Sequence, residues 1–182
     1  MRHGSYEPAE DTFLLTDAVR RYCGKNVLEI GVGSGFVTAE LSKRSLFVAG
    51  TDISRRALRD AKERLKSFKC SNVELICCDG ASPFREGCFD LIVFNPPYLP
   101  SKKIVDIAVD GGKEGIEVMV KFIVHSLRSI SNSGKMVFVS SIISSYDKAI
   151  EMLKERGFRV RKIGSRKMFF EDIFVMEASK AR

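Results

Sequence analysis

The stretch "NVLEIGVGSG" (26–35) joins a short apolar run to three closely spaced glycines. Residues 26–30 have the pattern of a buried strand, and a helix is predicted to begin just after the glycines, near Phe36. A glycine turn between a strand and a helix is where open α/β sheets bind their ligands. Dinucleotide-binding loops use G-x-G-x-x-G, and Phe36 stands where the third glycine of that pattern would be. The spacing therefore favours a cofactor without a pyrophosphate.

The rest of the chain continues this alternation of strand and helix. Ser54 is expected to cap one helix and Gly157 to close another. The alternation predicts an α/β fold with a mostly parallel sheet covered on both faces, while the last two strands, separated only by "SRK", should form a hairpin with one antiparallel strand. We expect a single domain over 1–182. Further strands are predicted at 46–52, 73–77, 89–94, 134–141, 158–164 and 169–177, and helices at 10–22, 36–43, 54–68, 113–130 and 144–157.

Composition excludes several classes of protein. Of the 182 residues, 45% are hydrophobic and 29% charged, as in an ordinary folded domain. No apolar run is long enough to cross a membrane as a helix, and the acidic first residues do not resemble a signal peptide. The five cysteines contain no C-x-x-C pair, and His3 and His125 are far apart, so no metal site is predicted. We expect a cytoplasmic protein without a metal.

The formal net charge is +7, and much of it lies in segments 55–69 and 154–167. Basic residues of this kind either form the solvated faces of amphipathic elements or bind an acidic partner or phosphates. The sequence leaves both interpretations open for these two segments.

Three acids follow successive predicted strands. Glu29 ends the first, Asp52 ends the second, and Asp79 follows the third. A carboxylate at the end of the second strand is the usual acceptor for ribose hydroxyls. Asp79 could accept from an adenine amino group, with Ile53 and Gly80 lining the ring, and Glu29 would add negative potential near a cationic ligand. Since the loop has no lysine for a phosphate, this pattern favours S-adenosylmethionine, with Gly31, Gly33 and Gly35 forming the loop around it.

The fourth predicted strand ends abruptly in "NPPY" (95–98). Proline cannot donate to a strand ladder, so this segment is a stiff corner rather than a continued strand. A planar amide or aromatic amine is a poor nucleophile and needs two fixed acceptors for its N–H groups. The side-chain oxygen of Asn95 and the backbone carbonyl of Pro96 could be those acceptors. Pro97 restricts the backbone, and the ring of Tyr98 offers a stacking face.

Five motifs in the same order resemble the HemK-type glutamine methyltransferases that modify peptide-chain release factors. They are "YEPAEDTFLL", "VLEIGVGSG", "TDIS", "FDLIVFNPPYLP" and "DGGKEGIEVM". The resemblance extends from Tyr6 to at least the helix after Gly115. It implies a seven-stranded, three-layer, Rossmann-like class I methyltransferase fold and methylation of the glutamine in a Gly-Gly-Gln motif, without a metal and with S-adenosyl-L-homocysteine as product. It also implies cofactor contacts at Thr12, Glu29, Gly31, Asp52, Asp79 and Asn95.

Bacterial members carry a further N-terminal helical domain, which this chain has no room for, so the resemblance is to the archaeal and eukaryotic branch. Members of that branch often work with a small zinc-binding activator protein, which is therefore an expected partner. The polar segment 100–115 could form a wall over the substrate or an ordinary loop before a helix. Tyr6 and Glu10 could help to close the cofactor pocket.

Two alternative functions remain. An adenine-N6 methyltransferase of DNA or RNA would use the same Asn-Pro-Pro-Tyr corner on a flipped base, and the net positive charge favours it slightly. The chain lacks an evident second domain or insertion to grip a duplex, which argues against it. A non-catalytic subunit that binds the cofactor and supports a partner is the other alternative, and the intact Asn95–Tyr98 corner argues against that.

Overall fold

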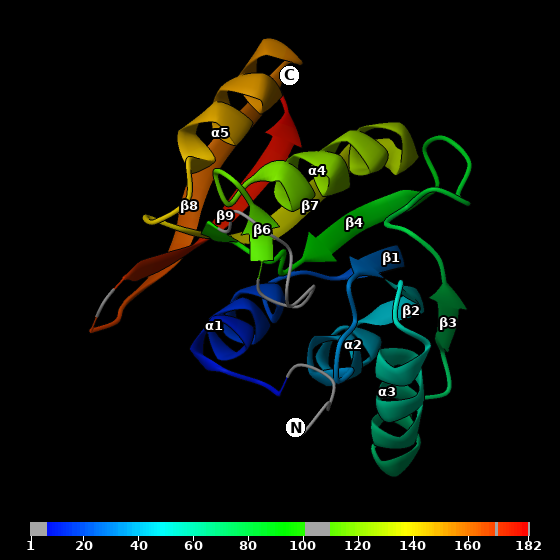
Figure 1. The fold of residues 1–182 in the computed structure, drawn as a ribbon. Coiled ribbons are helices and arrows are strands. Elements are labelled where there is room, and N and C mark those ends of the chain that lie inside the picture. The colour runs from blue at the N-terminus through cyan, green and yellow to red at the C-terminus, as the bar shows by residue number, and fades with distance from the viewer. Residues whose placement is uncertain (1–6, 101–109, 170, 182) are drawn as a thin grey trace.

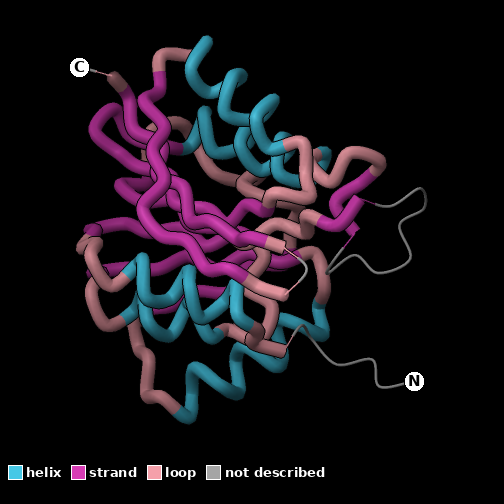
Figure 2. Tube along the Cα trace, turned by 90° about the vertical axis from the view of Figure 1, so that its left-hand side faces the viewer, coloured by secondary structure: helices cyan, strands magenta, loops and turns pink. Residues whose placement is uncertain are grey.

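Seven strands form one sheet in the computed structural model, which describes residues 7–100, 110–169 and 171–181. In spatial order they are β3 (Val73–Cys77), β2 (Ser45–Asp52), β1 (Gly24–Ile30), β4 (Phe89–Phe94), β7 (Ile130–Ser141), β9 (Asp172–Lys180) and β8 (Phe158–Lys167). One face is covered by α1 (Glu10–Val19), α2 (Phe36–Ser42) and α3 (Arg55–Ser67), the other by α4 (Glu117–Ser129) and α5 (Tyr146–Glu155) (Figure 1). Figure 2 shows the strands lying between these two layers of helices.

The strand order reverses at β1. The chain moves outward from β1 to β2 and β3, and then returns to the other side of β1 with β4. Neighbouring strands of this sheet are parallel except for β9, which runs antiparallel to both β7 and β8. The predicted α/β fold with one antiparallel strand from a C-terminal hairpin is confirmed. In such sheets, ligands bind beside the reversal, at the carboxyl ends of the strands.

Alternating side chains of β1 and β4 divide the apolar core between the two faces of the sheet. Leu28 and Ile92 are fully buried in a cluster that includes side chains of α4 and α5. Val27 and Leu91 belong to a second cluster, together with Leu15 of α1. Because successive side chains of a strand point to opposite faces, both faces are filled by one apolar run. The apolar side chains lie within the strands, and polar side chains such as Asp52 and Asn95 stand at or just after the strand ends.

Helix α1 is shorter than the predicted helix 10–22. It ends at Val19, and the backbone amide of Tyr22 donates to the Val19 carbonyl at 3.0 Å in a tighter turn. The hydroxyl of Tyr22 donates to the carboxylate of Glu177 on β9. This tertiary contact holds Tyr22 against the sheet, and helical periodicity alone does not reveal it.

Helix α4 begins at Glu117 rather than at residue 113. Gly112 and Gly115 have φ of +97° and +72°, a conformation incompatible with a right-handed helix. The Glu117 carboxylate accepts the backbone amides of Glu114 and Ile116 at 3.2 Å and 3.1 Å. The segment before α4 is thus a glycine turn fixed by the first side chain of the helix.

The C-terminal hairpin turns later than predicted. The predicted turn "SRK" lies inside β8, which pairs with β9 as far as Lys167 opposite Asp172. Beyond this ladder, the Met168 amide donates to the Glu171 carbonyl at 2.8 Å. The register shifts near Gly164, and the ladder then continues through the three residues that the sequence predicts as the turn.

Two helix ends match their predicted signals. The Ser54 hydroxyl accepts the amide of Ala57 at 3.2 Å and caps α3, and Gly157 follows α5 with φ of +79°. Residues 101–109 of the predicted wall 100–115 lie outside the described part of the chain, as does Tyr6. The described ends of that segment pair as β5 (Leu99–Pro100) and β6 (Asp110–Gly112). In the described residues, no helix has the length and apolar character that crossing a membrane requires.

Candidate active site

The carboxyl ends of β1, β2 and β4 lie level with one another. Ile30, the last residue of β1, pairs with Thr51 of β2 on one side and with Phe94 of β4 on the other. On the outer side of β2, Asp52 pairs with Cys77 at the end of β3. The loops that follow these strands therefore meet at one edge of the sheet. They carry Gly31, Gly33, Gly35, Ile53, Asp79, Gly80 and Asn95.

Hydrogen bonds attach the glycine loop to the end of β2. The amide of Gly31 donates to the Thr51 carbonyl at 2.8 Å, and the amide of Gly33 donates to Asp52 Oδ2 at 3.0 Å. Asp52 Oδ1 accepts the amide of Ser54 at 2.8 Å. Backbone donors thus orient both carboxylate oxygens of Asp52. Each oxygen has a second lone pair, so Asp52 can still accept hydrogen bonds from two hydroxyl groups.

Glycine is needed at the three loop positions for different physical reasons. All have positive φ, of +76° at Gly31, +51° at Gly33 and +76° at Gly35. A Cβ at Gly35 would lie 3.0 Å from Cα of Ala61, so this glycine lets the loop approach α3 closely. A Cβ at Gly31 would meet nothing nearer than a ring atom of Phe122, at 3.9 Å. Gly31 therefore leaves open space next to the end of β1, as a ligand requires.

Glu29 is a buried acid beneath this loop. Its side chain is 4% exposed and accepts a hydrogen bond from the Thr38 hydroxyl. Burial raises its pKa to about 8, Asp52 adds to the rise, and the bond from Thr38 partly opposes it. This pKa favours the protonated carboxyl at neutral pH. A cation bound beside Glu29 would lower the pKa, so negative potential from Glu29 toward a cationic ligand stays a prediction.

Asp79, expected to meet an adenine amino group, forms an ion pair with Lys121 of α4. Gly80 lies against the ring of His125, also on α4, and that ring fills the space where a Cβ would be. The side chain of Ile53 is largely exposed. The structure thus places Lys121 beside Asp79 and His125 beside Gly80, and sequence reasoning missed both of these α4 residues. Nothing in the sequence indicates that α4 packs on this loop, because the contact is long-range.

Asn95 follows β4 directly and carries an unusual atom. Its side-chain oxygen Oδ1 is buried and has no hydrogen-bond partner among the residues that the structure describes. Leaving a buried acceptor unsatisfied costs about 1–3 kcal/mol, a cost that an N–H donor of a ligand would remove. Nδ1 of His125 and the hydroxyls of Ser131 and Ser140 are likewise buried without a partner among the described residues. Pro96, next in the chain, is buried as well. Asn95 Oδ1 is thus a fixed acceptor at the carboxyl edge of the sheet, where it could receive a hydrogen bond from an N–H group of a substrate.

Two glycines of the "DGGKEG" segment hold this corner in place. A Cβ at Gly111 would lie 2.6 Å from the Pro97 carbonyl oxygen, and a Cβ at Gly115 would clash with the Tyr98 carbonyl oxygen. Only glycine allows the two backbones to approach so closely. The segment that the sequence presented as a connection is therefore packed against the corner.

The Tyr98 side chain faces α1. Its ring is partly buried beside the apolar cluster that includes Leu15, and its hydroxyl lies 3.4 Å from Asp11 Oδ2. Asp11 is 5% exposed and accepts the backbone amide of Thr12 at 2.6 Å. Thr12, a predicted cofactor contact, thus lies beside the corner on the first turn of α1. Asp11 was missed, although it lies in the quoted motif "YEPAEDTFLL", because nothing in the sequence pairs it with Tyr98.

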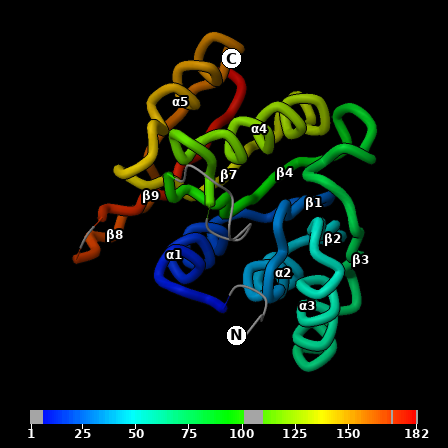
Figure 3. The backbone as a smooth tube through the Cα atoms, viewed as in Figure 1, coloured from blue at the N-terminus to red at the C-terminus, as the bar shows by residue number. Residues whose placement is uncertain are grey.

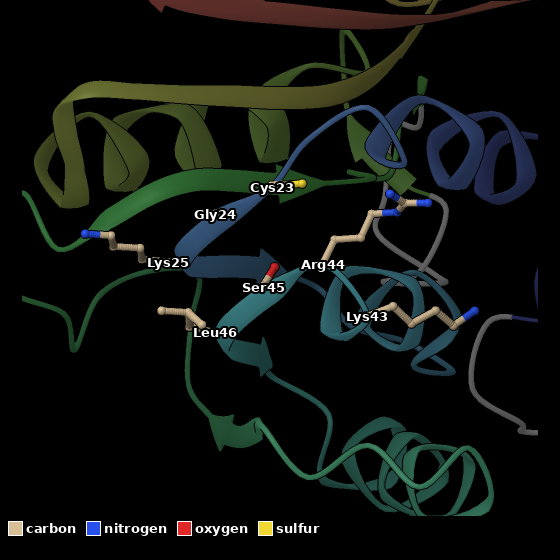
Figure 4. A pocket seen from close by; sticks show the side chains of 7 residues that line it. All are labelled: Cys23, Gly24, Lys25, Lys43, Arg44, Ser45 and Leu46. Carbon is tan, nitrogen blue, oxygen red and sulfur yellow. The ribbon is translucent and has the colours of Figure 1, made fainter.

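A separate open hollow lies at the opposite edge of the sheet, where β1 and β2 begin (Figure 4). It contains none of the predicted site residues, and its distance from the carboxyl edge excludes it from this site. Across the described ranges, no three His, Cys, Asp or Glu side chains are grouped as metal ligands would be. The hollow is lined by Cys23, Gly24, Lys25, Lys43, Arg44, Ser45 and Leu46.

Comparison with known proteins gives consistent matches. The family described as methyltransferase small domain matches residues 9–169. A Methanocaldococcus jannaschii protein that bears the provisional name protein N5-glutamine methyltransferase is 34% identical over 95% of this chain and 90% of its own length. The Mus musculus methyltransferase HEMK2 is 33% identical over 97% of this chain and 90% of its own length.

A solved structure agrees in shape as well. It is the E. cuniculi Mtq2–Trm112 complex, described as responsible for methylation of the translation termination factor eRF1. Its matching chain is 29% identical, with a TM-score of 0.81, over 97% of this chain and 99% of that one.

Proposed function

Because this chain belongs to the methyltransferase small domain family, we propose that it methylates the side-chain amide nitrogen of a protein glutamine, in the Gly-Gly-Gln motif of a peptide-chain release factor. The names of the relatives support this substrate class. They are a protein N5-glutamine methyltransferase, the methyltransferase HEMK2 and the catalytic subunit of an eRF1 methyltransferase, and each matches nearly the whole chain. The cofactor is S-adenosylmethionine. As the proposed substrate acts in translation, the cytoplasm is the proposed compartment.

One observation carries the proposal, the buried and unpartnered Oδ1 of Asn95. A glutamine amide has two N–H donors and a nitrogen lone pair that is delocalised into its carbonyl. Asn95 Oδ1 accepts one N–H, and the Pro96 carbonyl accepts the other. Held by both, the nitrogen presents its lone pair in one fixed direction. The residues act by positioning and by stabilising the positive charge that develops on the nitrogen as its bond to the methyl carbon forms and the sulfonium S–C bond breaks. No side chain needs to remove a proton first, because the cationic nitrogen releases one N–H proton to solvent after the transfer.

The chain's own residues fit the proposed cofactor. Gly31 leaves open space at the end of β1, and Asp52 retains lone pairs for two ribose hydroxyls. Asp79 and Ile53 border the adenine side, and the buried carboxyl of Glu29 lies beneath the loop. When bound, S-adenosylmethionine supplies an electrophilic methyl group on a sulfonium and is left as S-adenosylhomocysteine.

The test is a transfer assay with S-adenosylmethionine labelled in its methyl group. Purified release factor, a short peptide containing Gly-Gly-Gln, and nucleic acid are offered in parallel as acceptors. We expect label on the glutamine of the release factor, identified by mass spectrometry of its peptides. Replacing that glutamine with asparagine in the substrate should abolish the label.

The other outcomes decide between the alternatives. Label found only on adenine of nucleic acid would replace the proposal with an N6-adenine methyltransferase. Cofactor binding with no labelled acceptor, even with a partner protein present, would indicate a non-catalytic subunit. Each of these results contradicts glutamine methylation.

A small partner of the zinc-binding kind belongs to the proposal, by analogy with the Mtq2–Trm112 complex. The sheet has two edges where a partner strand could add. The edge strand β8 carries several exposed basic side chains, which discourage strand addition, whereas β3 carries one charge, at Glu74. Exposed apolar side chains at Leu46, Phe47 and Phe68 belong to β2 and the end of α3. We place the partner at β3.

Coexpression with a Trm112-type protein and size-exclusion chromatography test this placement. A one-to-one complex is expected for the native chain. Arginines in place of Glu74 and Cys77, both exposed on β3, should weaken it, while the control Arg159→Glu on β8 should not. A complex that survives the β3 changes and is lost with the β8 change would move the partner to the other edge.

A further inference from the structure

Four exposed apolar side chains gather where β7 ends and the β8–β9 hairpin turns. They belong to Ile142, Ile143, Met168 and Phe169, and we call them the tip patch. Their exposed fractions are 57%, 39%, 38% and 93%. Ile142 is tied to the hairpin because its amide donates to the Asp172 carbonyl at 3.0 Å. Exposed apolar side chains on two segments that a backbone hydrogen bond joins can form an interaction surface.

The tip patch lies at the carboxyl edge of the sheet, on the same side as the acceptor corner. β7 ends at Ser141, level with the start of β9, so both turns project from that edge. The hairpin reaches out beside α1 (Figure 3), and Arg166 of β8 forms an ion pair with Glu10 in the first turn of α1. That same turn contacts the corner, through Asp11 and the hydroxyl of Tyr98.

A second chain of contacts joins the tip patch to the corner from the other side. The amide of Ser145, just after Ile143, donates to the Glu114 carbonyl at 3.2 Å, and Lys148 Nζ contacts the Glu114 carboxylate at 2.6 Å. Glu114 precedes Gly115, which packs on the Tyr98 carbonyl. The turn at Ile142 and Ile143 and the acceptor corner are thus both held by Glu114 and Gly115. A folded substrate whose glutamine enters the corner would also cover the protein surface around it.

The acceptor corner alone offers little binding area. Asn95 and Pro96 can hold one carboxamide, whereas specific protein–protein interfaces bury roughly 1,200–2,000 Å². Binding energy for a folded substrate must therefore come from surface outside the corner, where it can also hold the reacting group in place. Leu99 and Phe13 are further exposed apolar side chains near the corner, but the tip patch is larger, and hydrogen bonds and ion pairs connect its two turns to the surroundings of the corner from two sides.

We infer that the tip patch is a docking surface for the folded release factor, and that it packs on apolar side chains of that protein while the glutamine enters the acceptor corner. This inference rests on the proposed function and names a second contact of the same substrate. The small partner is assigned to β3, at the far end of the strand order from the hairpin. A second copy of this chain is the other possible occupant, and the test below includes it.

The experiment compares a folded substrate with a short one. The variant carries Ile142→Ser, Met168→Ser and Phe169→Ser, and steady-state kinetics are measured on intact release factor and on a short peptide containing Gly-Gly-Gln. We expect KM for the intact protein to rise about tenfold or more, as for the loss of interface anchors. For the peptide, kcat/KM should stay within about twofold, since the corner is intact. The matched control is Val124→Ser, an exposed apolar residue on α4, which should behave as the native chain.

Further measurements separate the possible results. An unchanged melting temperature shows that the variant is folded, and size exclusion with and without the small partner shows whether another occupant was lost. Equal kinetics of variant and native chain on the intact protein overturn the docking surface but leave glutamine methylation standing. Loss of self-association or of the small partner in the variant also overturns it. If the native chain methylates neither the protein nor the peptide, the proposed function fails, and the docking surface fails with it.

Discussion

The two halves of the carboxyl edge differ in how their polar atoms are satisfied. On the cofactor half, both oxygens of Asp52 accept backbone amides, and Glu29 accepts from Thr38. On the acceptor half, Asn95 Oδ1 is buried without a partner among the described residues. The carboxylates of the first half are held by the protein itself, although Nδ1 of His125 beside Gly80 is also buried without a partner among the described residues, whereas the second half keeps its acceptor oxygen in reserve. This difference indicates that the cofactor half mainly binds the cofactor, while in the acceptor half Asn95 Oδ1 accepts a hydrogen bond from the reacting amide.

The largest effect is expected from removing the reserved acceptor. Asn95→Ala should lower kcat by roughly 10²–10³, as when one preorganised group that stabilises a transition state is lost. Cofactor affinity, measured by calorimetry, should change little, because the cofactor half is untouched. The control is Asn132→Ala, at an exposed side chain that accepts a hydrogen bond from Lys180. A large loss of cofactor affinity in Asn95→Ala would erase the distinction between the two halves.

A change in the cofactor half should weaken cofactor binding and leave kcat nearly unchanged. Asp52→Asn keeps the shape of the side chain but loses the charge and one acceptor, so the cofactor Kd should rise about 10–100-fold. At saturating cofactor, kcat should remain near that of the native chain. The exposed Asp60→Ala on α3 serves as control. If kcat falls while Kd is unchanged, Asp52 acts on the chemistry and the comparison is wrong.

Gly35 tests how closely the glycine loop depends on α3. Gly35→Ala adds a Cβ only 3.0 Å from Ala61 at a φ of +76°, and should lower the free energy of unfolding by about 2 kcal/mol. Gly87→Ala is matched, since Gly87 has a φ of +65° and nothing within 4 Å of an added Cβ. Gly87→Ala introduces backbone strain without a steric contact, so it should lower the free energy of unfolding by about 1 kcal/mol. Equal losses in urea unfolding would show that the contact with Ala61 is unimportant.

The smallest effect concerns the pH dependence of stability. Burial raises the pKa of Glu29 from its ordinary 4.5 to about 8, so between these values the unfolded chain is deprotonated while the folded chain keeps the proton. Native stability should therefore fall as pH rises through this window, by up to about 1.4 kcal/mol per pH unit. Glu29→Gln removes this contribution.

The difference in unfolding free energy between Glu29→Gln and the native chain should grow from pH 6 to pH 7, by about 1 kcal/mol. Glu74→Gln, at an exposed carboxyl on β3, is the control. A difference that stays constant between these pH values would mean that Glu29 is already ionised in the folded protein.

Local patterns in the sequence determined the elements and their order. Apolar runs and glycine turns predicted every strand of the sheet, and Ser54 and Gly157 marked helix ends as the structure has them. The glycine loop, the acids after the strands and Asn95 were also identified, since polar residues at the ends of parallel strands meet at one edge. These features depend on neighbouring residues, which the chain carries wherever it folds.

Only the tertiary structure decided which groups meet. The pairing of Asp79 with Lys121, the burial that raises the pKa of Glu29, and the contact of Asp11 with Tyr98 all depend on residues from different elements. The same is true of the glycines that press on the acceptor corner. A periodic pattern fixes which face of an element is apolar, but not which side chain of another element lies against it. Solvation and distance, and with them pKa and hydrogen bonding, are set by that packing.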